Sequence, residues 1–337
     1  MIDITLGRRN FIRMASLSVL LGLSGCSFAD RNRNPTLRLP KGILPREFLQ
    51  ALEKEKSWRY KYFNSGSDLV EGEFPFNKGH DLIALGDGWL KHCPFELFQA
   101  IESPEVYEHL NAQAMTFLNA FKPDISARIL PIAVSPWVLI FRGEKNFQLR
   151  ARDSWEVLLD PLLKDQVVLP SSPRVIMALA DKMNQPDSLR LLRLQSQIFD
   201  DRNGLNWLIS GKAKVAVLPL QTCLNTLASD PRLNIVLPKQ GSPLNWMVLL
   251  RSKFSQELLP SNWIKETWRL PLINNLLSKG VIPPISYSKV VKTIDYLPEK
   301  YHAIYNSQES FERSWSLPPL NELEEKDLEY RWVNSSP

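Results

Sequence analysis

The sequence has few cysteines and histidines. Its four histidines lie far apart, and no cluster of cysteine and histidine has metal-ligand spacing, so we expect no metal and no cofactor. After the N-terminal region, no segment is apolar enough to span a membrane. The formal net charge is only +5, without a cluster of Lys and Arg, so binding to nucleic acid is not expected.

Sequence motifs of several enzyme classes are missing as well. The chain has no Gly-x-Ser-x-Gly, no Cys-x-x-Cys, no His-Glu-x-x-His and no P-loop. Carboxylates are scattered along the chain. We therefore predict that the protein is not an enzyme.

The first 26 residues have the pattern of an export signal. Arg8 and Arg9 precede a short apolar run, and the segment ends in Leu-Ser-Gly-Cys at Cys26. The apolar run is well short of the roughly 20 residues that span a bilayer. The paired arginines resemble a twin-arginine export signal, and the last four residues resemble a bacterial lipobox. The resemblance implies a signal peptide at 1–26, lipidation of Cys26, a tether at 27–35 and a periplasmic protein that is lipid-anchored to a bacterial membrane.

Two cysteines remain after the lipobox, Cys93 and Cys223. A disulfide is chemically allowed outside the cytoplasm. An isolated cysteine is more often a small buried apolar residue, which is the role we expect for both. Whether they pair stays open.

Short apolar strands alternate with helices along the rest of the chain. Strands are expected at 36–39, 58–63, 81–85, 166–169, 212–218, 233–237 and 244–250. Helices are expected from Pro45, from Pro173, at 221–228 and at 261–277. The acidic last 17 or so residues are expected to be peripheral. Alternation of this kind favours the α/β class, with a parallel sheet flanked by helices.

Two local patterns make sharper predictions. Two apolar runs within 128–142 are joined by Ser135 and Pro136, and proline is disfavoured in the middle of a strand. We predict one long bent segment that passes from one sheet to another. Asp153 followed three residues later by Glu156 predicts a capping box at the start of a helix.

Four stretches, at 37–87, 154–174, 210–241 and 280–284, occur in an order similar to that of a known family. They resemble the type 2 periplasmic solute-binding proteins of ABC importers, and most of all the spermidine/putrescine-binding group. The resemblance implies two α/β lobes, each a mixed sheet flanked by helices, joined by two crossing strands. Lobe 1 would be 36–134 plus 247–282, and lobe 2 would be 135–246 plus 283–337. It further implies a monomer that gives a small solute to an ABC permease.

The resemblance also places ligand-binding residues between the lobes. Open α/β sheets bind ligands at the carboxyl ends of their strands. The candidates after the third strand and at the second-lobe helix are Asp87, Gly88, Trp89, Ser171, Ser172 and Arg174. The candidates on the crossing strands are Ser135, Trp137, Asn245 and Trp246. Trp89 could stack on the ligand, and backbone N–H groups at a helix start together with a guanidinium favour anions.

The nature of the solute stays open because the chain departs from the polyamine pattern. Positions that would carry acidic groups fall on Ser172, Val175 and Trp246, which leaves Asp87 as the clearest carboxylate. A cationic polyamine needs carboxylates or an aromatic cage. The ligand is therefore a polyamine or another small polar or anionic solute. A sensor or assembly lipoprotein of the same fold, and less favoured an exported enzyme, are the alternatives.

Overall fold

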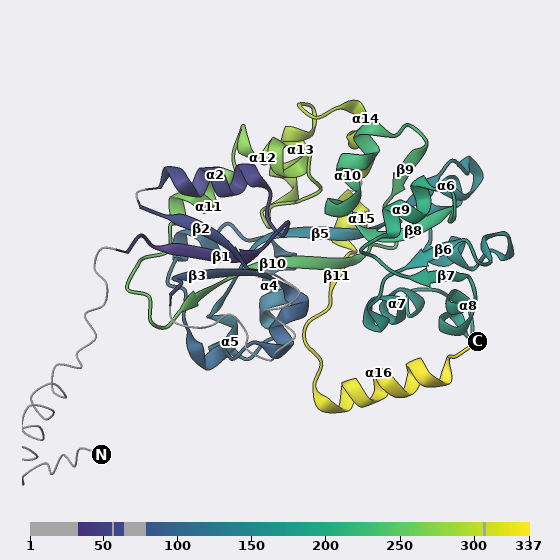
Figure 1. Cartoon of the computed structure of the whole chain (residues 1–337), viewed down its shortest axis with the longest axis horizontal. Helices are drawn as coiled ribbons and strands as arrows, with labels where there is room; N and C mark the ends of the chain where they lie inside the picture. Colours follow the sequence, from purple (N-terminus) through teal and green to yellow (C-terminus); the bar gives the residue numbers. More distant parts are fainter. Residues whose placement is uncertain (1–32, 56, 64–78, 306–307) are drawn as a thin grey trace, which may run out of the picture. The chain divides into compact units, whose positions relative to one another are not determined.

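A computed structural model describes residues 33–55, 57–63, 79–305 and 308–337 (Figure 1). The chain separates into two compact units, Met1–Asn34 and Pro35–Pro337, and the second contains all the described helices and strands. The predicted export arginines Arg8 and Arg9 and the predicted lipidation site Cys26 lie outside the described residues.

The described strands join into one mixed sheet with two halves, which we call lobe 1 and lobe 2. In lobe 1, β1 (Thr36–Pro40) pairs in parallel with β2 (Arg59–Phe63) and β3 (Leu82–Gly86). The long strand β10 (Pro243–Ser252) runs antiparallel to β3 and to the first half of β5 (Ile129–Arg142). Two short strands, β4 (Phe98–Gln99) and β11 (Trp315–Ser316), pair with opposite ends of β10.

Lobe 2 is built on the second half of β5. This half pairs antiparallel with β8 (Val215–Pro219) and β9 (Leu233–Val236). Beyond β8, β6 (Val167–Leu169) and β7 (Ser196–Phe199) continue the sheet in parallel.

Helices flank both lobes (Figure 1). The α-helices are α2 (Arg46–Lys54), α3 (Pro104–Tyr107), α4 (Ala112–Asn119), α5 (Pro123–Ser126), α6 (Lys145–Ala151), α7 (Pro173–Ala180), α8 (Ser188–Leu194), α9 (Gly204–Ile209), α10 (Leu220–Ser229), α11 (Ser261–Thr267), α12 (Leu272–Leu277), α13 (Tyr287–Ile294), α14 (Glu299–Tyr305), α15 (Gln308–Glu312) and α16 (Glu322–Asn334). The 3-10 helices are η1 (Asp87–His92), η2 (Phe95–Leu97), η3 (Trp155–Leu159) and η4 (Pro161–Leu163). The predicted α/β class is confirmed.

The crossing strand β5 is a single strand whose partner changes in its middle. Residues up to Pro136 pair with β10, and residues from Trp137 onward pair with β8. Pro136 lacks an N–H to donate to a ladder, and it stands where one ladder ends and the next begins. The predicted passage of this segment from one set of partner strands to another is confirmed. The chain passes between the lobes again from β9 of lobe 2 into β10.

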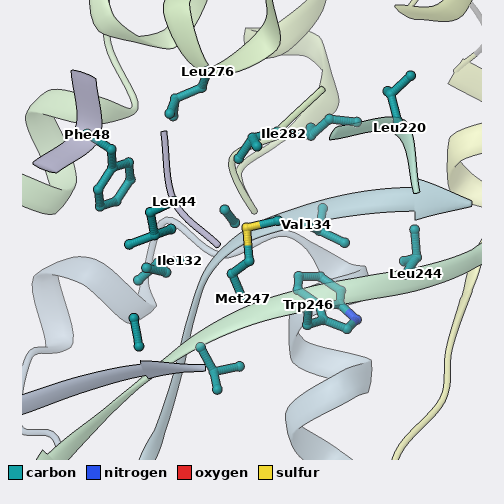
Figure 2. Packing of buried hydrophobic residues seen from close by; sticks show 14 of the residues in the cluster. Leu44, Phe48, Ile132, Val134, Leu220, Leu244, Trp246, Met247, Leu276 and Ile282 are labelled. Atoms are coloured by element: carbon teal, nitrogen blue, oxygen red, sulfur yellow. The ribbon is translucent and has the colours of Figure 1, made fainter. Parts of the chain in front are cut away.

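Buried side chains fill both lobes. The larger cluster surrounds β1, β3, β5 and β10, and Figure 2 shows Trp246 and Met247 of β10 beside Val134 of β5 within it. The smaller cluster lies in lobe 2 around Trp155, whose side chain has no exposed surface. The larger cluster also includes Ile140, Val168 and Leu218 of lobe 2, so it continues across both lobes. Burying one large apolar side chain contributes about 1.5–3 kcal/mol.

Two local predictions were wrong. Asp153 does not cap a helix, because Ser154 takes that place and accepts the Glu156 N–H at 3.0 Å, starting the 3-10 helix η3. The Glu156 carboxylate accepts the N–H of Asn184 at 2.8 Å, so it is engaged with a distant backbone group. The single helix expected at 261–277 is divided into α11 and α12, because Pro271 between them interrupts the helical hydrogen bonds.

The cysteines behave as the sequence indicated. Cys93 and Cys223 are both free and both buried. Burial raises the pKa of each thiol to about 12, so neither is a reactive thiolate at neutral pH.

Candidate functional site

A carboxylate side chain lies at the C-terminal end of the buried strand β3. Asp87 follows Gly86 directly and begins η1, with its side chain buried. The backbone N–H groups of Gly88 and Trp246 donate hydrogen bonds toward its carboxylate. Burial nevertheless raises the pKa of Asp87 to about 7, because loss of water disfavours the charged form more than these partners favour it.

A guanidinium from lobe 2 lies within electrostatic range of that carboxylate. Pro173 occupies the first turn of α7, and Arg174 follows it with a half-buried side chain. Burial lowers the pKa of Arg174, while the carboxylates of Asp87, Glu324 and Glu325 oppose that shift. One predicted residue from each lobe thus interacts electrostatically with the other.

Asn245 on β10 completes this group of predicted residues. An atom added at the Cα of Gly86 would lie 3.9 Å from Asn245 Oδ1, so the amide lies beside the end of β3. Trp89 is half-buried and packs against the lobe 1 core, and Gly88 is exposed. A carboxylate, a guanidinium, an amide and an indole ring together suit a small polar solute better than an apolar one.

The other predicted residues have structural partners. Ser171 donates its N–H to Asp201 Oδ1 at 2.9 Å, whereas Ser172 is the N-cap of α7 and makes no side-chain cap bond. Ser135 is fully buried and accepts the Gln221 N–H at 3.0 Å in the first turn of α10. Trp137 packs in the lobe 2 core. Contact between these side chains and a ligand stays a prediction.

Trp246 is the largest predicted contact and is fully buried. Its ring stacks on Phe117 with centroids 5.1 Å apart, and its Nε1 donates to Ser316 Oγ at 2.8 Å. The ring therefore holds β10, α4 and β11 together (Figure 2 shows its position on β10).

Sequence reasoning did not assign the C-terminal segment to this region. Arg174 donates to the carbonyl of Pro318, and a cavity of about 510 Å³ lies between α7 and α16. Its lining includes Arg174, Met177, Leu317, Leu328 and Arg331. A signal was present in the sequence, because Asn321 and Glu324 have capping-box spacing and the structure shows both hydrogen bonds of that motif.

Among the residues that the structure describes, no three His, Cys, Asp or Glu side chains are placed to hold a metal ion. Nor does any described helix have the length and apolar character needed to cross a membrane.

Comparison with known proteins adds a fold assignment. No family model matches the sequence, and no curated protein matches it. Solved structures do match, among them the spermidine/putrescine ABC transporter substrate-binding protein PotD from Streptococcus pneumoniae. Its TM-score is 0.66 at 15% identity, over 89% of this chain and 98% of that one. The fold is that of a two-lobe periplasmic binding protein.

Two further structures show the range of solutes that this fold accommodates. The ferric binding protein from Campylobacter jejuni has a TM-score of 0.58 at 12% identity, over 89% of this chain and 99% of that one. The TpPotD lipoprotein of Treponema pallidum has a TM-score of 0.57 at 13% identity, over 90% and 99%. Since a polyamine-type and a ferric-ion protein share the fold, the fold alone does not define the ligand.

Proposed function

We propose that the protein is an extracytoplasmic solute-binding protein of an ABC import system, which binds a small polar solute between its lobes. The observation that carries the proposal is the placement of Asp87 at the end of β3 and of Arg174 at the start of α7, on opposite lobes. Ligands of open α/β sheets bind at strand ends. Two lobes joined by crossing strands can close on such a ligand by hinge motion.

The solute presents polar groups to both charges. Asp87 suits an ammonium or a hydrogen-bond donor, and Arg174 with the free N–H groups of the α7 N-terminus suits an anionic or carbonyl oxygen. A cationic polyamine would be attracted by the carboxylate of Asp87 and repelled by the guanidinium of Arg174. A zwitterionic or anionic solute therefore fits these side chains better, and the protein acts without covalent chemistry or a cofactor.

The protein is anchored through a lipid on Cys26 after export directed by Arg8 and Arg9. We expect Cys26→Ser to move the protein from the membrane fraction to the soluble fraction, and Arg8→Lys with Arg9→Lys to leave it in the cytoplasm. Cell fractionation followed by immunoblotting measures both. Membrane association of Cys26→Ser equal to that of the wild type would contradict the anchor.

Binding is tested by thermal unfolding of the full chain with putrescine, spermidine, amino acids, dicarboxylates and phosphate. A solute at 100 times its dissociation constant should add about 2.7 kcal/mol of stability. Asp87→Asn and Arg174→Gln should each reduce that gain strongly. Lys239→Gln is the control, since Lys239 pairs with Asp153 at the surface of lobe 2. A solute that stabilises all four proteins equally would contradict a site between Asp87 and Arg174.

A second candidate function is sensing or assembly without transport. It is favoured by one observation, the hydrogen bond from Arg174 to the carbonyl of Pro318 in the C-terminal segment. A site residue that the chain itself already binds suits a protein that a partner must first release. Import of the bound solute by cells, lost when either this protein or an ABC permease is deleted, distinguishes the two.

A further inference from the structure

The last part of the chain forms a helix with its own stabilising interactions. We call residues Leu317–Asn334 the strap, which consists of an extended stretch followed by α16. Asn321 accepts the N–H groups of Leu323 and Glu324 at 3.0 Å each, and Glu324 accepts the Asn321 N–H at 2.8 Å. Acidic residues in the first turn and Arg331 in the last turn suit the helix dipole. No residue of α16 is fully buried, but Leu328 and Trp332 are partly buried and pack against the lobe 2 core.

Three arginines, two from lobe 2 and one from the strap, join the strap to lobe 2. Arg174 of α7 donates to the carbonyl of Pro318, and Arg331 of α16 pairs with Asp181 at the end of α7. Arg193 of α8 lies 4.1 Å above the ring of Trp332, and it also donates to the carbonyl of that residue. Figure 1 shows α16 running beneath α7 and α8. These contacts extend over the whole length of the strap.

Lobe 1 contacts the strap from the other side. Lys91 of η1, four residues after Asp87, forms an ion pair with Glu325 at 2.6 Å. The segment before the strap is tied to lobe 1 as well, because Trp246 Nε1 donates to Ser316 Oγ at 2.8 Å. The strap therefore connects the two lobes independently of β5 and β10, next to the two charged residues of the proposed site.

We infer that the strap is an intramolecular latch, which holds the two lobes together beside Asp87 and Arg174 and must leave Arg174 before the lobes separate fully. Its Pro318 carbonyl occupies a donor of Arg174, and its first-turn carboxylates face the same guanidinium. The ion pairs Lys91–Glu325 and Arg331–Asp181 are exposed or half-exposed and individually weak, as a reversible latch requires.

The role of the latch depends on the proposed function, but the experiment that tests the latch needs no solute. Spin labels on Glu266→Cys of α11 and Arg190→Cys of α8, both exposed, report the distance between lobes in a chain carrying Cys26→Ser. A chain that ends at Ser316 should show a longer and broader distance distribution, with at least a tenfold rise in the open-to-closed ratio. An unchanged distribution overturns the latch while leaving the solute-binding test intact.

Charge reversal tests the same inference without removing any residue. Glu325→Lys and Lys91→Glu should each raise the open fraction, by up to about fivefold for one exposed ion pair. The double variant should return it toward the wild-type value. Asp153→Lys is the matched control, since it breaks the 2.8 Å pair with Lys239 within lobe 2 and should leave the distance unchanged. Equal effects of the control and the Glu325 variant also overturn the latch.

Discussion

Gly241→Ala is expected to lower the free energy of unfolding by about 2–5 kcal/mol, because the substitution causes both backbone strain and a steric clash. Gly241 has a φ of +83°, where a side chain is strained. A Cβ there would lie 2.4 Å from the carbonyl carbon and oxygen of Arg313, which are backbone atoms that cannot swing away. The Gly241 carbonyl also accepts the Trp155 Nε1–H at 2.8 Å, which links this turn to the lobe 2 core.

Gly143→Ala is the matched control for this prediction. Gly143 has a similar φ of +72°, but nothing lies within 4 Å of an added Cβ. Only the backbone cost of about 1–2 kcal/mol should then appear. Urea unfolding of both variants measures the difference. Equal losses would show that the chain before β11 does not approach Gly241 as closely as described.

Asp87→Asn is expected to be more stable than the wild type at pH 8, by about 2–4 kcal/mol, and nearly equal to it at pH 4. The pKa of Asp87 is about 7 in the folded protein and 3.8 ordinarily. Between these values the folded state binds the proton more tightly than the unfolded state. The wild type therefore loses stability as pH rises through this window, by up to about 1.4 kcal/mol per pH unit. Asparagine keeps an acceptor for the N–H groups of Gly88 and Trp246 and does not titrate.

Urea unfolding of both proteins from pH 4 to pH 8 measures this difference. Other titrating groups are common to the two proteins and cancel in the comparison. A difference that does not change with pH would mean that Asp87 is charged throughout and that burial does not raise its pKa.

Local sequence patterns were sufficient to predict the elements on which the site depends. Two apolar runs around Pro136 predicted β5, since the proline had to lie at a break in the ladder. A buried strand before Asp87 and a Ser-Pro start before Arg174 placed these two residues at a strand end and a helix start. Both features are encoded within a few neighbouring residues.

Features that depend on distant contacts could not be predicted in the same way. Glu156 has capping-box spacing, but its carboxylate meets the N–H of Asn184, 28 residues later. The strap is tied down by Lys91 and Glu325, which lie in different elements and far apart in the chain. No local pattern specifies such pairs. An exposed charge can pair with several partners at similar free energy, and the tertiary structure determines which of them lies within reach.

The central claim is that a solute bound between Asp87 and Arg174 closes the two lobes upon each other. The distance between labels at Glu266→Cys and Arg190→Cys, recorded with and without the solute identified by thermal unfolding, tests it most directly. The account predicts one narrow distance with solute and a broader distribution without it, and no narrowing in Arg174→Gln. A solute that stabilises the protein while the distance distribution stays the same would contradict it.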